Sequence, residues 1–228
     1  MGIFLKRFLI ALFFFVGASY ADTVGQIRIS GNVSVDSTEI LTKLSSVSGG
    51  LLLTENIEAD MEAIYAMGVF KDTISAETER ISKATVDIVF HVEENPYIKQ
   101  ILFVGAQSFS PEELLLSTNS QPGQLLNYAS LRLDIQALTN YYHDRGYVLM
   151  RVKEIIEPQK DEVLTFVIKE GVIEDIFIKG TTFTKEFVIT REMTTHIGGA
   201  FNVSTLQGDV RNIYNTGYFD DVNIDPPL

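Results

Sequence analysis

The stretch VEENPYIKQILFVG, residues 92–105, decides how the rest of the chain is organised. It joins the end of one alternating apolar segment to a second short apolar run that stops at Gly105. A similar stretch, VIKEGVIEDIFIKG, occupies residues 167–180, and IRISG stops in the same way at Gly31. The three terminal glycines, Gly31, Gly105 and Gly180, are 74 and 75 residues apart, and such a regular period indicates duplicated units.

Two further features recur in the same order within each copy. One is a glycine with an apolar residue two places later, at Gly50, Gly123 and Gly199. The other is a tyrosine followed by a glycine at the end of a helical segment, as in Tyr65/Gly68, Tyr142/Gly146 and Tyr214/Gly217. Because glycine adopts left-handed backbone conformations at little cost, six glycines are expected to be structural turn residues. They are Gly31, Gly68, Gly105, Gly146, Gly180 and Gly217.

The first copy shows the expected order of elements. Ile27 and Ile29 alternate with polar residues, which is typical of a half-buried strand. Asp36, with Glu39 three residues later, predicts the start of a first helix. An apolar face over residues 57–65 predicts a second helix, and two strands follow. The fold class is therefore α+β, with β-α-α-β-β modules in which two helices cover one face of a three-stranded mixed sheet.

The repeats divide the mature chain into residues 22–94, 95–170 and 171–228. The third module is incomplete, since its sequence contains the opening strand, both helices and only the start of a second strand at Asp221 to Ile224. We therefore expect the third module to be the least ordered, with Asp221 to Leu228 unpaired or paired abnormally. We interpret the chain as a fragment, a partial gene product or a truncated protein.

Residues 1–21 have the three parts of a secretory signal peptide. Lys6 and Arg7 form a positive start, and an unbroken apolar run follows from Phe8 to Val16. Ser19 and Ala21 then supply small residues for cleavage after Ala21. The alternative is an uncleaved membrane anchor, but nine apolar residues rise only about 14 Å as a helix, roughly half of a hydrocarbon core. Export is therefore expected.

Composition excludes several classes of function. The chain has 18 Lys and Arg against 30 Asp and Glu, a formal charge of −12, and no Cys. Nucleic-acid binding requires clustered cations, so no nucleic-acid partner is expected. Without Cys, thiol catalysis, iron–sulfur clusters and Cys-ligated zinc are excluded. The three histidines lack metal-ligand spacing, and no nucleophile elbow or phosphate-binding loop occurs, so we expect neither an enzyme, nor a cofactor, nor a metal.

The repeated order β-α-α-β-β, the corners GVFKD and GYFDD, and the joint at residues 92–105 resemble POTRA domains, the polypeptide-transport-associated modules of the BamA/TamA outer-membrane assembly superfamily. The resemblance covers about residues 24–228. It implies modules on the periplasmic face of the bacterial outer membrane, carried ahead of a C-terminal membrane barrel. The implied partners are unfolded outer-membrane β-barrel proteins, together with accessory assembly lipoproteins or periplasmic chaperones.

The exposed edges of the sheets are the candidate partner-binding sites, because an edge strand presents unpaired N–H and C=O groups to which another strand can add. The expected edges are the opening strands at Gln26 to Ser30, Gln100 to Val104 and Glu174 to Lys179, and the second strands at Phe70 to Ala76 and Val148 to Ile155. The candidate residues are Phe70, Lys71, Ile74, Val148, Leu149, Met150, Arg151 and Val152. These edges could instead be solvated or covered by neighbouring modules.

Two other functions fit the sequence. One is the POTRA region of a TamA-like or two-partner-secretion transporter, which would serve a narrower range of clients. The other, from a different class, is an exported enzyme whose site is built across modules. Sequence alone does not separate the BamA-like from the TamA-like role.

Overall fold

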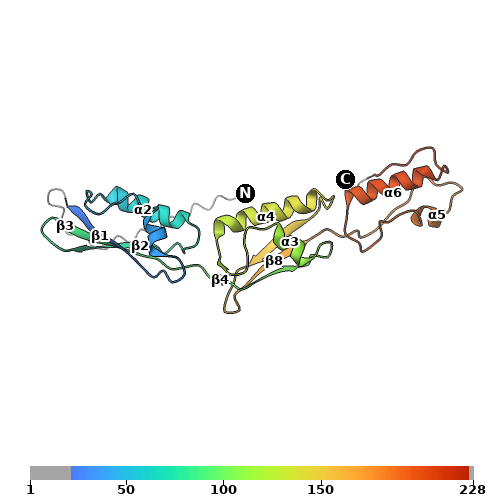
Figure 1. Cartoon of the computed structure of the whole chain (residues 1–228). Coiled ribbons are helices and arrows are strands. Elements are labelled where there is room, and N and C mark those ends of the chain that lie inside the picture. The colour runs from blue at the N-terminus through green and yellow to red at the C-terminus, as the bar shows by residue number, and fades with distance from the viewer. Residues whose placement is uncertain (1–21, 226–228) are drawn as a thin grey trace. The chain divides into compact units, whose positions relative to one another are not determined.

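The computed structural model describes residues 22–225 (Figure 1). The predicted signal peptide at residues 1–21 and the last three residues lie outside the described part. The chain forms two compact units. Within the described residues, one contains residues 22–98 together with Gly123–Leu131, and the other contains Lys99–Pro122 together with residues 132–225.

The first module has the predicted order of elements. They are β1 (Thr23–Ser30), α1 (Ser37–Leu41), α2 (Thr54–Ala66), β2 (Ser75–Arg80) and β3 (Thr85–His91). The sheet order is β1-β3-β2, in which β3 runs parallel to β1 and antiparallel to β2. The last strand is therefore the central one, and the sheet is mixed.

Alternation along β3 positions the core of this module. Val86, Ile88 and Phe90 are buried on the side that faces the helices. α1 begins at the predicted position, because the side chain of Asp36 accepts a hydrogen bond from the Thr38 N–H. The remaining buried members of the core come from β1, both helices and the segments around them: Val24, Ile40, Ile57, Ile64, Phe70 and Val92.

The second module repeats this architecture. Its elements are β4 (Tyr97–Ile98), β5 (Gln100–Val104), α3 (Pro111–Leu116), β6 (Gln124–Leu125), α4 (Tyr128–His143), β7 (Arg151–Ile156) and β8 (Val163–Lys169). The sheet order is β5-β8-β7, with β8 parallel to β5 and antiparallel to β7. Ser110 and Glu113 form the expected capping box at the start of α3. In Figure 1 the long helices α2 and α4 each lie along one face of their own sheet.

The third module contains α5 (Glu186–Thr190) and α6 (Val203–Asn215), and no strand among its described residues. The predicted opening strand at Glu174 to Lys179 and the predicted strand start at Asp221 to Ile224 are therefore both wrong. The physical reason is that both segments would flank the central strand, and no described segment takes that position. Residues 221–225 take part in no strand pairing, as predicted, and residues 226–228 lie outside the described part.

Of the described helices, none is both long enough and apolar enough to cross a membrane.

Candidate partner-binding site

The opening strands of the sheets are partly covered at their outer edge. In the first module the Val24 N–H donates to the Gly50 carbonyl and the Leu52 N–H donates to the Asp22 carbonyl, both at 2.8 Å. The segment around Gly123 pairs with Pro96 and Ile98 in the same way, and Gly199 accepts from Ile173 at 2.9 Å. The recurring glycine with an apolar residue two places later therefore lies in a loop that covers the beginning of β1 in the first module, β4 just before β5 in the second, and the segment at Ile173 in the third.

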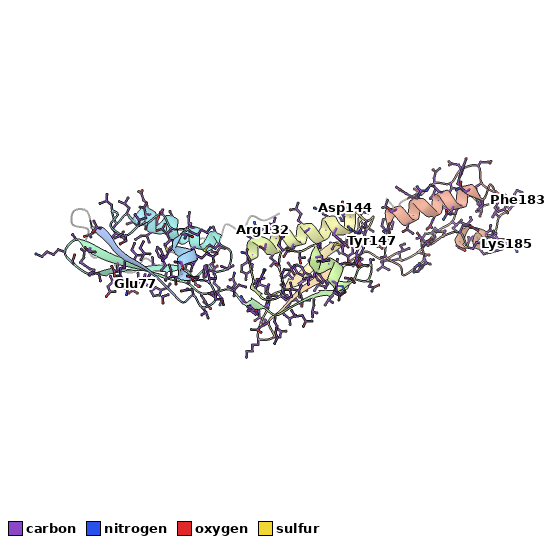
Figure 2. The ribbon with its side chains drawn as sticks, in the orientation of Figure 1. Glu77, Arg132, Asp144, Tyr147, Phe183 and Lys185 are labelled. Atoms are coloured by element: carbon purple, nitrogen blue, oxygen red, sulfur yellow. The ribbon has the colours of Figure 1, made fainter. Side chains whose placement is uncertain are left out.

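The outer edge of β2 is charged. Arg28 on β1 forms ion pairs with Glu79 at 3.0 Å and with Asp87 at 3.6 Å, across the face of the sheet. His91 on β3 lies 3.3 Å from Glu77, which Figure 2 marks on this sheet. Charged side chains on an edge strand disfavour pairing with another chain, because the added strand would have to desolvate them.

The outer edge of β7 is more accessible to pairing. Within the described residues, no backbone hydrogen bond joins the outer side of this six-residue strand to another segment. Its register with β8 shifts between Val152 and Glu154, which leaves Lys153 as the extra residue of a bulge. Beyond the bulge the strand ends in Ile155 and Ile156, and Ile156 is 49% exposed. This edge presents a free main chain and an apolar end.

The five candidate residues of the second module lie at the start of this strand. Arg151 and Val152 belong to β7, whereas Val148, Leu149 and Met150 precede it. Val148 and Leu149 are exposed, but the side chain of Met150 is only 3% exposed and belongs to the core. Met150 is therefore not accessible as a side-chain contact.

The three candidates of the first module lie outside β2, so the predicted strand position at Phe70 to Ala76 needs correction. β2 begins only at Ser75. Phe70 is 1% exposed, and its backbone forms a bridge with Glu94. Lys71 donates its N–H to the Glu93 carbonyl at 2.8 Å and also forms an ion pair with Glu93. Phe70 and Lys71 thus use their backbone within the module, and Ile74 lies in the connection to β2.

All six turn glycines have positive φ angles, between 74° and 97°. A side chain is least tolerable at Gly31 and Gly105. A Cβ at Gly31 would overlap the Val92 carbonyl oxygen, and a Cβ at Gly105 would overlap the Ile168 carbonyl oxygen. These two positions combine a left-handed conformation with a close approach to the neighbouring central strand.

A set of three buried aspartates was missed by the sequence reasoning. Asp60, Asp134 and Asp209 are 0%, 0% and 1% exposed, and each lies in the long helix of its module. Each carboxylate accepts hydrogen bonds from two consecutive backbone N–H groups of the loop that follows the short helix. The donors are Ser45 and Ser46, Asn119 and Ser120, and Thr194 and Thr195. These bonds attach the loop to the long helix.

The electrostatics of these carboxylates follow from the same contacts. Burial tends to raise the pKa of Asp209, but the hydrogen bonds from Thr194 and Thr195 outweigh it, so the pKa is lowered. The signal that could have identified the set is its spacing: the aspartates lie 74 and 75 residues apart, as do the glycines that end the opening segments.

Two glutamates connect the end of each central strand to the turn after the opening strand. Glu94 accepts from the N–H groups of Val33, Ser34 and Val35 at 2.7–2.9 Å. Glu170 does the same for Gln107 and Ser108, and it also accepts from the buried hydroxyl of Tyr142 at 2.9 Å.

Burial alone would raise the pKa of both glutamates, yet the hydrogen bonds lower it. Burial and the bond to Glu170 raise the pKa of the Tyr142 hydroxyl. Glu94 and Glu170 are therefore structural anions. Over the described residues, no group of three or more His, Asp or Glu is arranged so that it could hold a metal ion.

The family model for POTRA, described as "surface antigen variable number repeat", matches residues 23–95, 96–171 and 172–228. The chain belongs to the POTRA family. Its sequence is similar to that of BamA proteins, and its structure is similar to that of Omp85 POTRA domains.

Two curated relatives are informative. The chain is 27% identical over 219 residues to an outer membrane protein assembly factor of Treponema pallidum (strain Nichols), covering 86% of this chain and 26% of that protein. It is 26% identical over 139 residues to the outer membrane protein assembly factor BamA of Nitratidesulfovibrio vulgaris, covering 61% of this chain and 17% of that protein. The POTRA chain thus spans about a quarter or less of the length of these relatives.

Solved structures give the same fold. The N-terminal domain of Omp85 from Thermosynechococcus elongatus superposes with a TM-score of 0.73 at 26% identity, covering 91% of each chain. POTRA1-3 of the periplasmic domain of Omp85 from Anabaena superposes with a TM-score of 0.58 at 25% identity, covering 90% of each chain.

Proposed function

We propose that this chain is the periplasmic POTRA region of an outer membrane protein assembly factor, and that it binds unfolded β-barrel precursors by strand addition. The names of the relatives support the first part. The observation that carries the second part is the outer edge of β7, whose main chain pairs with no other described segment. The POTRA region would act as a binding and chaperoning module, with accessory lipoproteins or periplasmic chaperones as further partners.

The β7 edge fits this role better than the other edges. The β2 edge carries Glu79, which is paired with Arg28, and Glu77, which lies 3.3 Å from His91, so an added strand would disturb existing interactions. The beginning of β1 is covered by the loop at Gly50, β5 is one residue shorter than β7, and the opening segment of the third module forms no strand among the described residues. β7 also carries charged side chains, at Arg151, Lys153 and Glu154, but none of them forms an ion pair among the described residues. Val152 and Ile155 face the same side as the core residues of β8, so they extend the apolar pattern to the edge.

The strength of such binding follows from the length of the edge. Alternate residues of an edge strand point their N–H and C=O outward, so six residues offer about three pairing positions. Each net hydrogen bond contributes about 0.5–1.5 kcal/mol, and ordering the client opposes it. Capture should be weak and reversible, and it should depend little on client sequence, which suits a receptor for many barrel precursors.

The test uses the absence of cysteine from the chain. A single cysteine at Lys153 on β7 carries a photo-crosslinker, and the probe is an unfolded peptide with alternating apolar residues from a membrane β-strand. Matched variants place the cysteine at Glu77 on β2 and at Gln136 on the exposed face of α4. We expect efficient crosslinking from position 153, less from position 77 and background from position 136.

A second peptide with proline at alternate positions, which cannot donate main-chain hydrogen bonds there, should lose the crosslink. Equal crosslinking of both peptides, or crosslinking that is strongest from position 136, would reject strand addition at β7.

A further inference from the structure

The joints between consecutive modules share one hydrogen-bonded arrangement. In the first compact unit, Asn127 lies immediately before α4, and its Oδ1 accepts from the Ala129 N–H at 2.9 Å. Its Nδ2 donates to the Met67 carbonyl at 2.9 Å, and the Tyr128 N–H donates to the Gly68 carbonyl at 3.3 Å. The residue that caps one long helix therefore also binds the turn that ends the preceding one.

The second compact unit contains the same arrangement. Asn202 caps α6 by accepting from the Thr205 N–H at 3.0 Å. Its Nδ2 donates to the Arg145 carbonyl at 2.8 Å, and the Val203 N–H donates to the Gly146 carbonyl at 2.9 Å. Two joints built from different residues thus use the same four groups: two carbonyls of a glycine turn, one amide side chain and one backbone N–H.

The glycine of each turn is needed for this contact. A Cβ at Gly68 would lie 2.5 Å from Asn127 Oδ1, and a Cβ at Gly146 would lie 2.5 Å from Asn202 Oδ1. Any side chain at these positions would displace the asparagine of the following helix. Glycine is therefore required here both by its positive φ angle and by the approach of the next module.

The first long helix of the chain, α2, lacks the asparagine side chain that donates to the preceding turn in the other two. The residue that precedes α2 is Leu53, which makes no side-chain cap. Leu53, Asn127 and Asn202 are equivalent, because each lies seven residues before the buried aspartate of its helix. The first module can therefore receive another module at Gly68, but it cannot dock onto a preceding turn through an amide side chain.

The last glycine turn, at Gly217, has the carbonyl groups that would accept these hydrogen bonds, but no asparagine-capped helix start lies against it among the described residues. Gly217 has a φ of +74°, and Thr216 ends α6 with the same backbone hydrogen bond to residue i−3 that Met67 makes at the end of α2. No described atom lies within 4 Å of the position of its Cβ. Tyr218 is 65% exposed, whereas Val69 and Tyr147 in the corresponding positions are partly covered.

We propose that the turn Thr216–Gly217–Tyr218 is a docking site for the asparagine-capped start of a long helix from a further POTRA module. The carbonyls of Thr216 and Gly217 would accept from the asparagine Nδ2 and from the next backbone N–H. The occupant is fixed by the two filled copies of the same turn in this chain. A second unmodified copy does not fit, because both of the asparagines that cap its long helices are engaged and its first long helix begins after Leu53. The inference does not depend on strand addition.

The test joins two copies of residues 22–228 through a flexible Gly/Ser linker, with only the first copy isotope-labelled. The linker raises the effective concentration of a weak docking partner to the millimolar range. Three forms of the second copy are compared: the natural one, Leu53→Asn and Leu53→Asp. Asparagine and aspartate cap a helix about equally well, but only asparagine can donate to a carbonyl.

We expect the amide signals of Gly217 and Tyr218 in the first copy to shift with Leu53→Asn alone, and to return when Gly217→Ala is added. Because alanine is strained at the positive φ angle of this turn, the Asn and Asp pair is the deciding comparison. Signals that are unchanged with Leu53→Asn, or that shift equally with Leu53→Asp or with natural Leu53, would overturn the proposal.

Discussion

Replacement of the buried carboxylate of the second module tests whether it holds the module together. Asp134 is completely buried in α4 and accepts from the Asn119 N–H at 2.6 Å and from the Ser120 N–H at 3.1 Å. In Asp134→Ala both N–H groups lose their acceptor. An unsatisfied buried N–H costs about 1–3 kcal/mol, while removal of a buried charge relieves part of that loss. We expect the free energy of unfolding to fall by about 2–4 kcal/mol.

The measurement is urea denaturation followed by far-UV circular dichroism, because the chain has no Trp to report on folding by fluorescence. The matched control is Asp144→Ala, an exposed aspartate at the end of α4 (Figure 2), whose removal should change stability by less than about 0.5 kcal/mol. Asp134→Asn keeps one acceptor oxygen and should fall between the two. If Asp134→Ala unfolds at the same urea concentration as Asp144→Ala, the loop is not held by this carboxylate and the reasoning is refuted.

Three further perturbations test the joints and the glutamate anchors. Asn202→Asp keeps the helix cap but removes the donor to the preceding turn, so hydrogen exchange of the Val203 N–H should accelerate while helix content stays constant; unchanged exchange would contradict the joint. Tyr142→Phe removes a buried donor to Glu170, so the free energy of unfolding should fall by about 1–2 kcal/mol and the pKa of Glu170, measured by NMR titration, should rise. The pKa values of Glu94 and Glu170 are lowered in the folded state, so their contribution to stability is complete above the ordinary glutamate value of about 4.3 and is lost as the pH falls through their folded values. Unfolding free energy measured between about pH 6 and 3 should therefore decline on acidification, and less steeply in Glu170→Gln; equal slopes would argue against this role.

The regular features of the modules were predictable from local signals. The capping box at Ser110 and Glu113 depends only on residues three apart, and it is present at the predicted position. Alternation along β3 and β8 indicated their burial, since a central strand has one face against the helices. These predictions succeeded because each signal, a cap or an alternation, is written within one element.

The position of β2 could not be predicted in the same way. The sequence GVF at residues 68–70 looks like the start of a strand, but Phe70 turns into the core and its backbone pairs with Glu94. The strand itself is SAETER, which lacks apolar alternation because neither of its faces carries a large apolar side chain. Its position is set by pairing with β3, a contact distant in sequence.

The alignment of the copies by their tyrosines was also misleading. Tyr65 and Tyr214 lie five residues after the buried aspartate of their helix and are exposed, whereas Tyr142 lies eight residues after Asp134 and is buried. The reason is that α4 has 16 residues, against 13 in α2 and in α6, so its aromatic end reaches the interior near Glu170. The aspartates keep the true register, because each must meet a loop at a fixed place along its helix.

The spacing of the aspartate and the asparagine links the interior of a module to its joint. Seven residues are almost two helical turns, so Asn202 and Asp209 lie on nearly the same side of α6. At the start of the helix, Asn202 donates a hydrogen bond to the Arg145 carbonyl of the preceding turn. Two turns later, Asp209 accepts hydrogen bonds from the loop of its own module. A change in the loop can therefore reach the joint through one rigid helix, without involving the sheet edge proposed to bind clients. It follows that joint variants such as Asn202→Asp should leave crosslinking from position 153 intact, whereas blocking the β7 edge should leave the exchange of the Val203 N–H unchanged.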